Sequence, residues 1–292
     1  MARGIDHLVL PVEELDIARG RYEALGFTVA PDARHPFGTE NACVFFANRT
    51  YLEPLAVADR MEVEDNARKG LVFLRRFLAY RFRHGLDGFC MLAMKGESAD
   101  ADKARFDEAG FGDTPVFPFE RKAVSSDGEK TIGVRLAYAL DDMAPDVTLF
   151  VCQHINTDFF WEPERTTHRN GATGVLEVVM TEDNPADFQY LLQAVTDTRD
   201  DYASSFGLHF DLGANRISVL SPVAYRAMYG EEAPNLGRGL RLAAFLVGVE
   251  SLNTVAALLD EGNVAFRKSG DMLIVPPAPG QGATVVFKEN RT

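Results

Sequence analysis

An imidazole and a carboxylate each interrupt an apolar, strand-like run near the start of the chain. His7 lies within residues 5–10, and Glu53 lies within residues 51–55, where it shares one strand face with Tyr51 and Leu55. Burying such groups is unfavourable unless a partner pairs with them or a metal ion binds them. The two runs therefore predict a small polar site inside a β scaffold.

The elements that must position this site repeat along the chain. Apolar strands at residues 5–10, 88–94, 174–180 and 240–248 each lead to a stretch with helical spacing, and further short strands follow each of them. The spacing predicts an α+β fold of four βαβββ units, a repeat whose units must stack to bury their apolar faces.

Two segments interrupt this repeat. Residues 66–83 carry Leu71, Leu74, Leu78 and Phe82 at helical spacing, which predicts a helix bridging the first two units. Residues 157–173 are predicted to be a linker. The expected N-terminal domain is therefore residues 1–156, with units at 4–58 and 86–156, and the C-terminal domain is residues 174–292.

Composition narrows the class of partner. The 292 residues include 43 acidic and 30 basic side chains, and the net charge of −13 disfavours nucleic acid and anionic membranes. No apolar run approaches the length of a membrane span, and no secretory signal is recognised. The odd number of cysteines, Cys43, Cys90 and Cys152, is typical of reduced thiols in a cytoplasmic protein.

Seven stretches carry a family resemblance: residues 4–10, 24–29, 35–41, 51–53, 150–154, 161–163 and 168–172. On these residues the chain resembles the vicinal oxygen chelate superfamily, and within it the glyoxalase-like double-domain proteins. The resemblance implies cupped mixed sheets whose first and fourth strands place metal ligands inside a cup. The superfamily contains isomerases, lyases, dioxygenases, resistance enzymes and metal-free drug-binding proteins, so the fold alone does not choose the reaction.

The resemblance also implies a ligand set. His7 and Glu53 occupy the first-strand and fourth-strand positions of the first unit. In the second unit, Gly88 aligns with His7 and cannot bind a metal, while strand alternation lets only one of Gln153 and His154 face the cup. We expect His7, Glu53 and His154 to hold a divalent ion, Zn, Ni, Mn or Fe, with open positions for substrate. Glu53 could instead act as a general base.

Other candidate residues would bind substrate. They are His35, Gly38, Thr39 and Asn41 in a turn-rich loop, Arg121 as a carboxylate anchor, Gln153, and Trp161, His168 and Asn170 in the linker. Each has a structural alternative: turn capping for the loop, a surface ion pair for Arg121, and domain pinning or capping for the linker residues. Glu177 aligns with His7 in the third unit but has no companion ligands, so the C-terminal half is expected to be scaffolding.

The leading functional expectation is a metal-dependent isomerase or lyase acting on a small vicinal-oxygen substrate. A metal-free small-molecule binding protein of the drug-sequestering, resistance type and a ring-cleaving dioxygenase are the alternatives, and a structural module is a third. Expected partners are a small molecule and, through the open outer strands, a second copy in a homodimer.

Overall fold

A computed structural model describes residues 2–125, 128–234, 237 and 239–290. The elements of the N-terminal half are β1 (Ile5–Pro11), α1 (Leu15–Ala24), β2 (Ala33–Arg34), β3 (Thr39–Asn41), β4 (Val44–Phe45), β5 (Tyr51–Val57), α2 (Arg60–Arg68), α3 (Val72–His84), β6 (Met91–Gly96), α4 (Ala99–Glu108), β7 (Phe117–Ser125), β8 (Gly128–Ala139) and β9 (Thr148–Ile155). Two short helical turns follow, η1 (Asp158–Trp161) and α5 (Pro163–Thr166).

Within the described residues, the C-terminal half follows a similar order, with no counterpart of β4 and with one helix, α7, in the place of α2 and α3. Its elements are β10 (Ala172–Thr181), η2 (Pro185–Phe188), α6 (Gln189–Thr196), β11 (Asp201–Ala203), β12 (Gly207–Asp211), β13 (Arg216–Leu220), α7 (Pro222–Tyr229), β14 (Arg241–Val249), α8 (Leu252–Glu261), β15 (Arg267–Ser269), β16 (Met272–Val275) and β17 (Thr284–Glu289).

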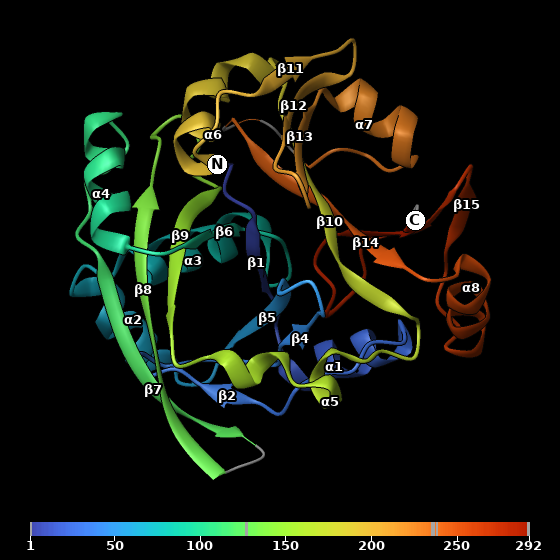
Figure 1. Cartoon of the computed structure of the whole chain (residues 1–292), viewed down its shortest axis with the longest axis horizontal. Helices are drawn as coiled ribbons and strands as arrows, with labels where there is room; N and C mark the ends of the chain where they lie inside the picture. The colour runs from blue at the N-terminus through green and yellow to red at the C-terminus, as the bar shows by residue number, and fades with distance from the viewer. Residues whose placement is uncertain (1, 126–127, 235–236, 238, 291–292) are drawn as a thin grey trace.

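Each half forms one curved mixed sheet, and the two sheets lie side by side (Figure 1). Among the described residues, the first sheet runs β2-β3-β5-β1-β6-β9-β8-β7, with β4 on β5, and the second runs β11-β12-β13-β10-β14-β17-β16-β15. In both, the first strands of two units pair antiparallel at the centre, β1 with β6 and β10 with β14. The predicted α+β fold of two glyoxalase-like domains is confirmed.

A helix packs into the concave side of each sheet. In the N-terminal half, α3 buries Phe73, Phe77 and Tyr80 against Val9 and Met91. In the C-terminal half, α7 packs Tyr225 and Tyr229 among apolar residues of β10, β13, β14, β16 and β17. These helices fill most of each cup, so any ligand must use the space that they leave.

The bridging segment differs from its prediction. Gly70, at φ +99°, separates α2 from α3, so residues 66–83 do not form one helix. The buried stripe of α3 consists of Phe73, Leu74, Phe77 and Tyr80, whereas Phe82 is 91% exposed. Of the expected stripe, Leu74 is buried and Leu71 and Leu78 pack partly buried against the same cluster, so only the prediction for Phe82 is wrong.

The convex sides of the two sheets share one hydrophobic core. Phe27 stacks on Phe287 with ring centroids 5.8 Å apart, and Phe89 meets Phe245 edge-on at 6.2 Å. Helix α1 also contacts α8, and α4 contacts α6. The cups therefore face away from this shared core. None of the described helices is long and apolar enough to cross a membrane.

Candidate functional site

The N-terminal cup retains a cavity of about 50 Å³ with many aromatic lining residues, which has room for only a few water molecules or a very small group. We call it the aromatic cavity. Its lining residues come from both units and from α3: His7, His35, Phe37, Asn41, Cys43, Phe45, Tyr51, Glu53, Phe73, Phe119, Arg121, Ile132, Gly133, Val134, Leu136, Phe150, Cys152, His154 and Phe160.

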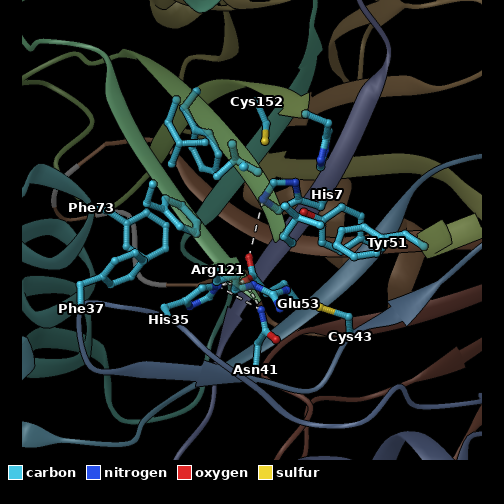
Figure 2. Close-up of a pocket in the computed structure, with 18 of the residues that line it drawn as sticks. His7, His35, Phe37, Asn41, Cys43, Tyr51, Glu53, Phe73, Arg121 and Cys152 are labelled. Carbon is cyan, nitrogen blue, oxygen red and sulfur yellow. Dashed lines mark hydrogen bonds and ion pairs between the residues drawn. The ribbon is translucent and has the colours of Figure 1, made fainter. Parts of the chain in front are cut away.

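His7 and Glu53 face each other across this cavity. The Nε2 atom of His7 lies 3.6 Å from Oε2 of Glu53, and both side chains are buried. Each is fixed from behind, since Nδ1 of His7 donates to Asp6 Oδ1 at 2.6 Å and Asn41 Nδ2 donates to Glu53 Oε1 at 2.6 Å. Figure 2 shows Glu53 between His7 and Asn41. Partners of this kind hold the ring and the carboxylate in one orientation.

A register shift in β1 brings Asp6 to the site as well. The pairing of β1 with β6 slips between Ile5 and His7, so Asp6 and its neighbour both reach the same group of side chains. Asp6 Oδ1 accepts hydrogen bonds from Nδ1 of His7 and from Nε2 of His154, the second at 2.9 Å. Sequence alternation alone would have placed Asp6 on the opposite face.

The Asp6–His154 pair is ionised. Burial opposes this by raising the pKa of Asp6, but the charge and hydrogen bonds of His154 and His7 outweigh it and hold that pKa well below its usual range. Burial likewise lowers the pKa of His154, and the charge of Asp6, with a contribution from Cys152, raises it well above its usual range. The imidazolium and the carboxylate stabilise each other.

Strand register identifies the residues of the second unit that lie opposite His7 and beside it. Ala93 pairs with His7 across the two central strands. The helices that follow these strands begin at Leu15 and Ala99, 84 residues apart, so Met91 is the repeat equivalent of His7 and the sequence alignment of Gly88 was wrong by three residues. Glu53 stands two residues beyond Tyr51, the partner of His7, and Cys152 stands two residues beyond Phe150, the partner of Ala93. Cys152 therefore lies relative to Ala93 as Glu53 lies relative to His7, and His154 lies two residues further along the same face of β9.

The predicted loop surrounds the carboxylate. His35 Nε2 lies 3.7 Å from Glu53 Oε1 and 3.4 Å from Asn41 Nδ2, while its Nδ1 atom hydrogen bonds with Thr39 Oγ1 at 2.9 Å. Burial, with the positive charges of Arg121 and His7, lowers the pKa of His35 to about 3, so this ring is neutral near pH 7. Thr39 therefore acts on the cavity through His35.

Gly38 supports the loop without lining the cavity. Its φ is +94°, and a Cβ atom there would meet the backbone nitrogen of Val63 at 2.9 Å. Its carbonyl oxygen accepts hydrogen bonds from the backbone nitrogens of Ala58 and Asp59 at the start of α2. A side chain at this position would force the loop away from α2.

Arg121 lines the aromatic cavity from β7, close to His35 and Glu53 in Figure 2.

Gln153 lies outside the aromatic cavity, because its Oε1 atom accepts a hydrogen bond from the backbone nitrogen of Ala99 at the start of α4. Trp161 is half-buried against Tyr51 and Phe45, at ring distances of 6.2 and 5.8 Å. It lines a neighbouring cleft.

His168 and Asn170 join the linker to the body of the N-terminal half. His168 Nδ1 accepts from the backbone nitrogen of Thr28 at 3.0 Å, and Nε2 donates to the carbonyl oxygen of Phe45 at 2.9 Å. Asn170 donates to the carbonyl oxygen of Leu25 at 2.8 Å. Both side chains are buried and satisfied by backbone, so the structure places them outside the cavity.

The donor atoms at the site have a spacing that fits a divalent cation. Two atoms bound to one such ion lie about 3–4 Å apart, which matches the separation of His7 Nε2 and Glu53 Oε2. In the part of the chain that the structure describes, one group of four offers ligand atoms within 4.8 Å of one another: Asp6, His7, Cys152 and His154. His7 belongs to both arrangements, and Asp6 and Cys152 were not predicted.

A glyoxalase-like domain model matches residues 5–196, well over half of the chain. The chain belongs to the glyoxalase-like family. No curated protein matches its sequence. This glyoxalase-like chain has the fold of a hypothetical protein from Staphylococcus aureus, with a TM-score of 0.70 at 13% identity over 99% of this chain and 100% of that one.

Two further solved structures share the fold of the glyoxalase-like chain. A mutant of 4-hydroxymandelate synthase from Streptomyces coelicolor gives a TM-score of 0.56 at 12% identity, over 99% of this chain and 92% of that one. The Mn(II)-bound glyoxalase from Novosphingobium aromaticivorans gives 0.54 at 11% identity, over 99% and 83%. The similarity places the chain in the vicinal oxygen chelate fold, which hosts more than one reaction.

Proposed function

We propose that the protein is a metal-dependent enzyme of the glyoxalase type, an isomerase or lyase acting on a small oxygenated compound in the N-terminal cup. The observation that carries this proposal is the buried His7–Glu53 pair, whose Nε2 and Oε2 atoms face each other at 3.6 Å and are each held by a second partner. Such preorganisation is typical of metal ligands and their supporting residues.

His7 and Glu53 would hold the ion, as the family position of each implies. Cys152 and His154 are the further donors, since each offers a ligand atom within 4.8 Å of His7. We keep His154 as the proposed third ligand, which requires its ring to exchange the Asp6 partner for the ion. A bound divalent cation supplies Lewis-acid polarisation of substrate oxygens.

The surrounding side chains would orient the substrate and move a proton. As the alternative to holding the ion, Glu53 is the proposed general base, because Asn41 fixes Oε1 and leaves Oε2 directed into the cavity. Arg121 would hold an anionic group or a developing oxyanion. The neutral His35 ring would orient the substrate next to Glu53, and the phenylalanines around the cavity would exclude water.

A metal-free binding protein is the second candidate. The ionised Asp6–His154 pair favours it, because these groups satisfy each other without a cation. Ala93, which carries no ligand atom, stands opposite His7 and also supports this alternative. A ring-cleaving oxygenase remains a third option with the same ligands. Cytoplasmic location is part of the proposal, because all three cysteines are buried free thiols.

Elemental analysis tests the metal. The parent, purified without tag or chelator and reloaded with manganese, iron, nickel or zinc, should hold close to one ion per chain. The His7→Ala variant should lose it, and the His209→Ala variant, which removes an imidazole from the other cup, should keep it. A parent that stays empty after every reload would contradict the metal-dependent proposal and favour the binding protein.

A further inference from the structure

A cleft of about 300 Å³ lies next to the aromatic cavity and is not used by the chemistry proposed above. We call it the rim cleft. Cys152 and His154 line both spaces, so the rim cleft meets the aromatic cavity at the end of β9. Its remaining wall comes from segments far apart in sequence: the turn before β5, the end of β6, and the segment that follows β9.

The rim cleft carries two cations without an acidic partner. Within the described residues, the Arg49 guanidinium makes no hydrogen bond or ion pair, and the Lys95 ammonium donates one hydrogen bond, to the backbone oxygen of Asn48 at 3.4 Å. Burial and the nearby positive charge of Arg49 lower the pKa of Lys95. The negative charge of Asp6 acts in the opposite direction and raises it. Two like charges gathered in one cleft of a chain with net charge −13 would be relieved by a bound anion.

Within the described residues, neither acidic residue of the cleft forms an ion pair with these cations. Asp6 accepts hydrogen bonds from His7 and His154, so its charge is already shared by two imidazoles. Asp158 is the other acidic residue in the lining, and it is exposed.

Backbone conformation marks the same place. Arg49 and Asn156 both line the rim cleft and adopt left-handed conformations, at φ +61° and +60°. They are two of the four non-glycine residues with positive φ in the described chain. Such conformations are strained in non-glycine residues and gather at functional sites.

The opposite side of the aromatic cavity lacks this feature. A second cleft, which includes Arg34, Arg121 and Lys122, also borders the cavity. There Arg34 pairs with Glu62 at 3.1 Å and Lys122 pairs with Glu129 at 2.6 Å. The cations of that cleft, Arg121 apart, are therefore engaged, whereas both cations of the rim cleft are available.

We propose that the rim cleft binds the anionic group, a phosphate or a carboxylate, of a substrate whose reacting end enters the aromatic cavity past Cys152 and His154. This deepens the function proposed above and rests on it. Arg49 and Lys95 provide the charge, and the exposed Asn156 supplies a further hydrogen-bonding side chain. The substrate class is then a small oxygenated compound with an anionic end.

Trp161 reports on the cleft directly, because it is the single tryptophan of the chain and lines the cleft. Inorganic phosphate and acetate are titrated separately into the full-length protein while tryptophan fluorescence is followed. Arg49→Asn, which keeps a residue that tolerates the left-handed backbone, and Lys95→Gln should each weaken the response about tenfold or more. Asp158→Asn should strengthen it, and Lys122→Gln should leave it unchanged.

The outcomes separate this proposal from the metal site. Stronger binding of phosphate would identify a phosphorylated substrate, and stronger binding of acetate would identify a carboxylic acid. A His7→Ala, Glu53→Ala double variant should keep the anion response even without metal, whereas the Arg49 and Lys95 variants should keep their metal. Absence of any response in the parent, or a response unchanged in both cation variants, would overturn the proposal.

Discussion

The two cups are built on the same register but carry different chemistry. In the first, the four equivalent positions are His7, Glu53, Ala93 and Cys152. In the second, the same pairings select Glu177, Ser218, Leu246 and Lys288. One cup thus presents an imidazole opposite a carboxylate, and the other presents a carboxylate whose neighbours include a hydroxyl and a lysine.

Glu177 is satisfied by protein groups alone. Ser218 donates a short hydrogen bond to Glu177 Oε1, and His209 Nδ1 lies 2.8 Å from the same hydroxyl. Burial raises the pKa of Glu177. The hydrogen bond from Ser218 and the positive charges of Arg216 and Lys288 lower it, but by less. The C-terminal cup therefore balances its carboxylate with hydroxyl and basic side chains. The comparison shows that the strand scaffold is retained while a few substitutions remove the pair suited to a cation.

The largest difference between the cups should appear in catalysis. Glu53→Gln keeps the shape of the side chain but removes the base, so proton exchange into D2O from a vicinal-oxygen probe such as hydroxyacetone should fall about 10²–10⁴-fold. Ser218→Ala, at the equivalent position, should leave the rate unchanged. The exchange is followed by proton NMR. Equal rates in the parent and Glu53→Gln would remove Glu53 from the reaction.

The helices that fill the cups should contribute similarly to stability. Phe73→Ala in α3 and Tyr229→Ala in α7 each empty a buried aromatic position, which costs about 3–5 kcal/mol of unfolding free energy. Only Phe73 lines the aromatic cavity, so only its variant should also change binding there. Chemical denaturation with parallel metal analysis measures both effects. Loss of metal in Tyr229→Ala would show that the cups are coupled.

Acid should weaken the attachment of the linker to the N-terminal half through His168. Burial lowers the pKa of His168 to about 4, opposed by its bond to the Phe45 carbonyl oxygen, and protonation would direct a second N–H at the backbone N–H of Thr28. Its contribution is present above pH 6.5 and is lost as the pH falls toward 4. Between pH 7 and 4.5 this amounts to about 2 kcal/mol.

Denaturant unfolding of the parent and of His168→Gln at these two pH values isolates this contribution. The variant should lose less stability on acidification than the parent, because the buried titrating ring is gone. A pH dependence identical to that of the parent would show that other groups dominate acid unfolding.

The smallest effect concerns the residue behind the carboxylate. Asn41→Ala removes the 2.6 Å hydrogen bond to Glu53 and should weaken metal binding about 10–100-fold without abolishing it. His209→Ala, behind Ser218 in the other cup, should not alter metal affinity. Competitive titration with a chromophoric chelator measures both constants. An undiminished affinity in Asn41→Ala would show that Glu53 does not need its support.

The amino-acid sequence was sufficient to predict the four repeated units and to select two residues that lie at the centre of the site. His7 and Glu53 stand out because a polar group in an apolar strand needs an explanation, and the structure brings both of them into one cavity. The choice of His154 over Gln153 also follows from strand alternation once Cys152 is known to face the cavity, while Gln153 turns to α4.

Tertiary details explain the remaining differences. The register shift that turns Asp6 toward His154 and the pairing that sets Ala93 opposite His7 depend on contacts between β1 and β6, which no local pattern encodes. His168 and Asn170 have side chains suited to a ligand, but their backbone partners appear only when the linker packs on the N-terminal half. In the second unit, Cys152 and His154 lie two residues apart in a strand, so strand alternation could have shown that both side chains face the cavity.

The most direct test of the account is a crystal structure of the protein soaked in manganese, with an anomalous difference map. We predict a single strong peak in the N-terminal cup beside His7 Nε2 and Glu53 Oε2, and none beside Glu177 in the C-terminal cup. A peak held by Asp6 with Cys152 but away from Glu53, a peak in the other cup, or no peak at all would contradict it.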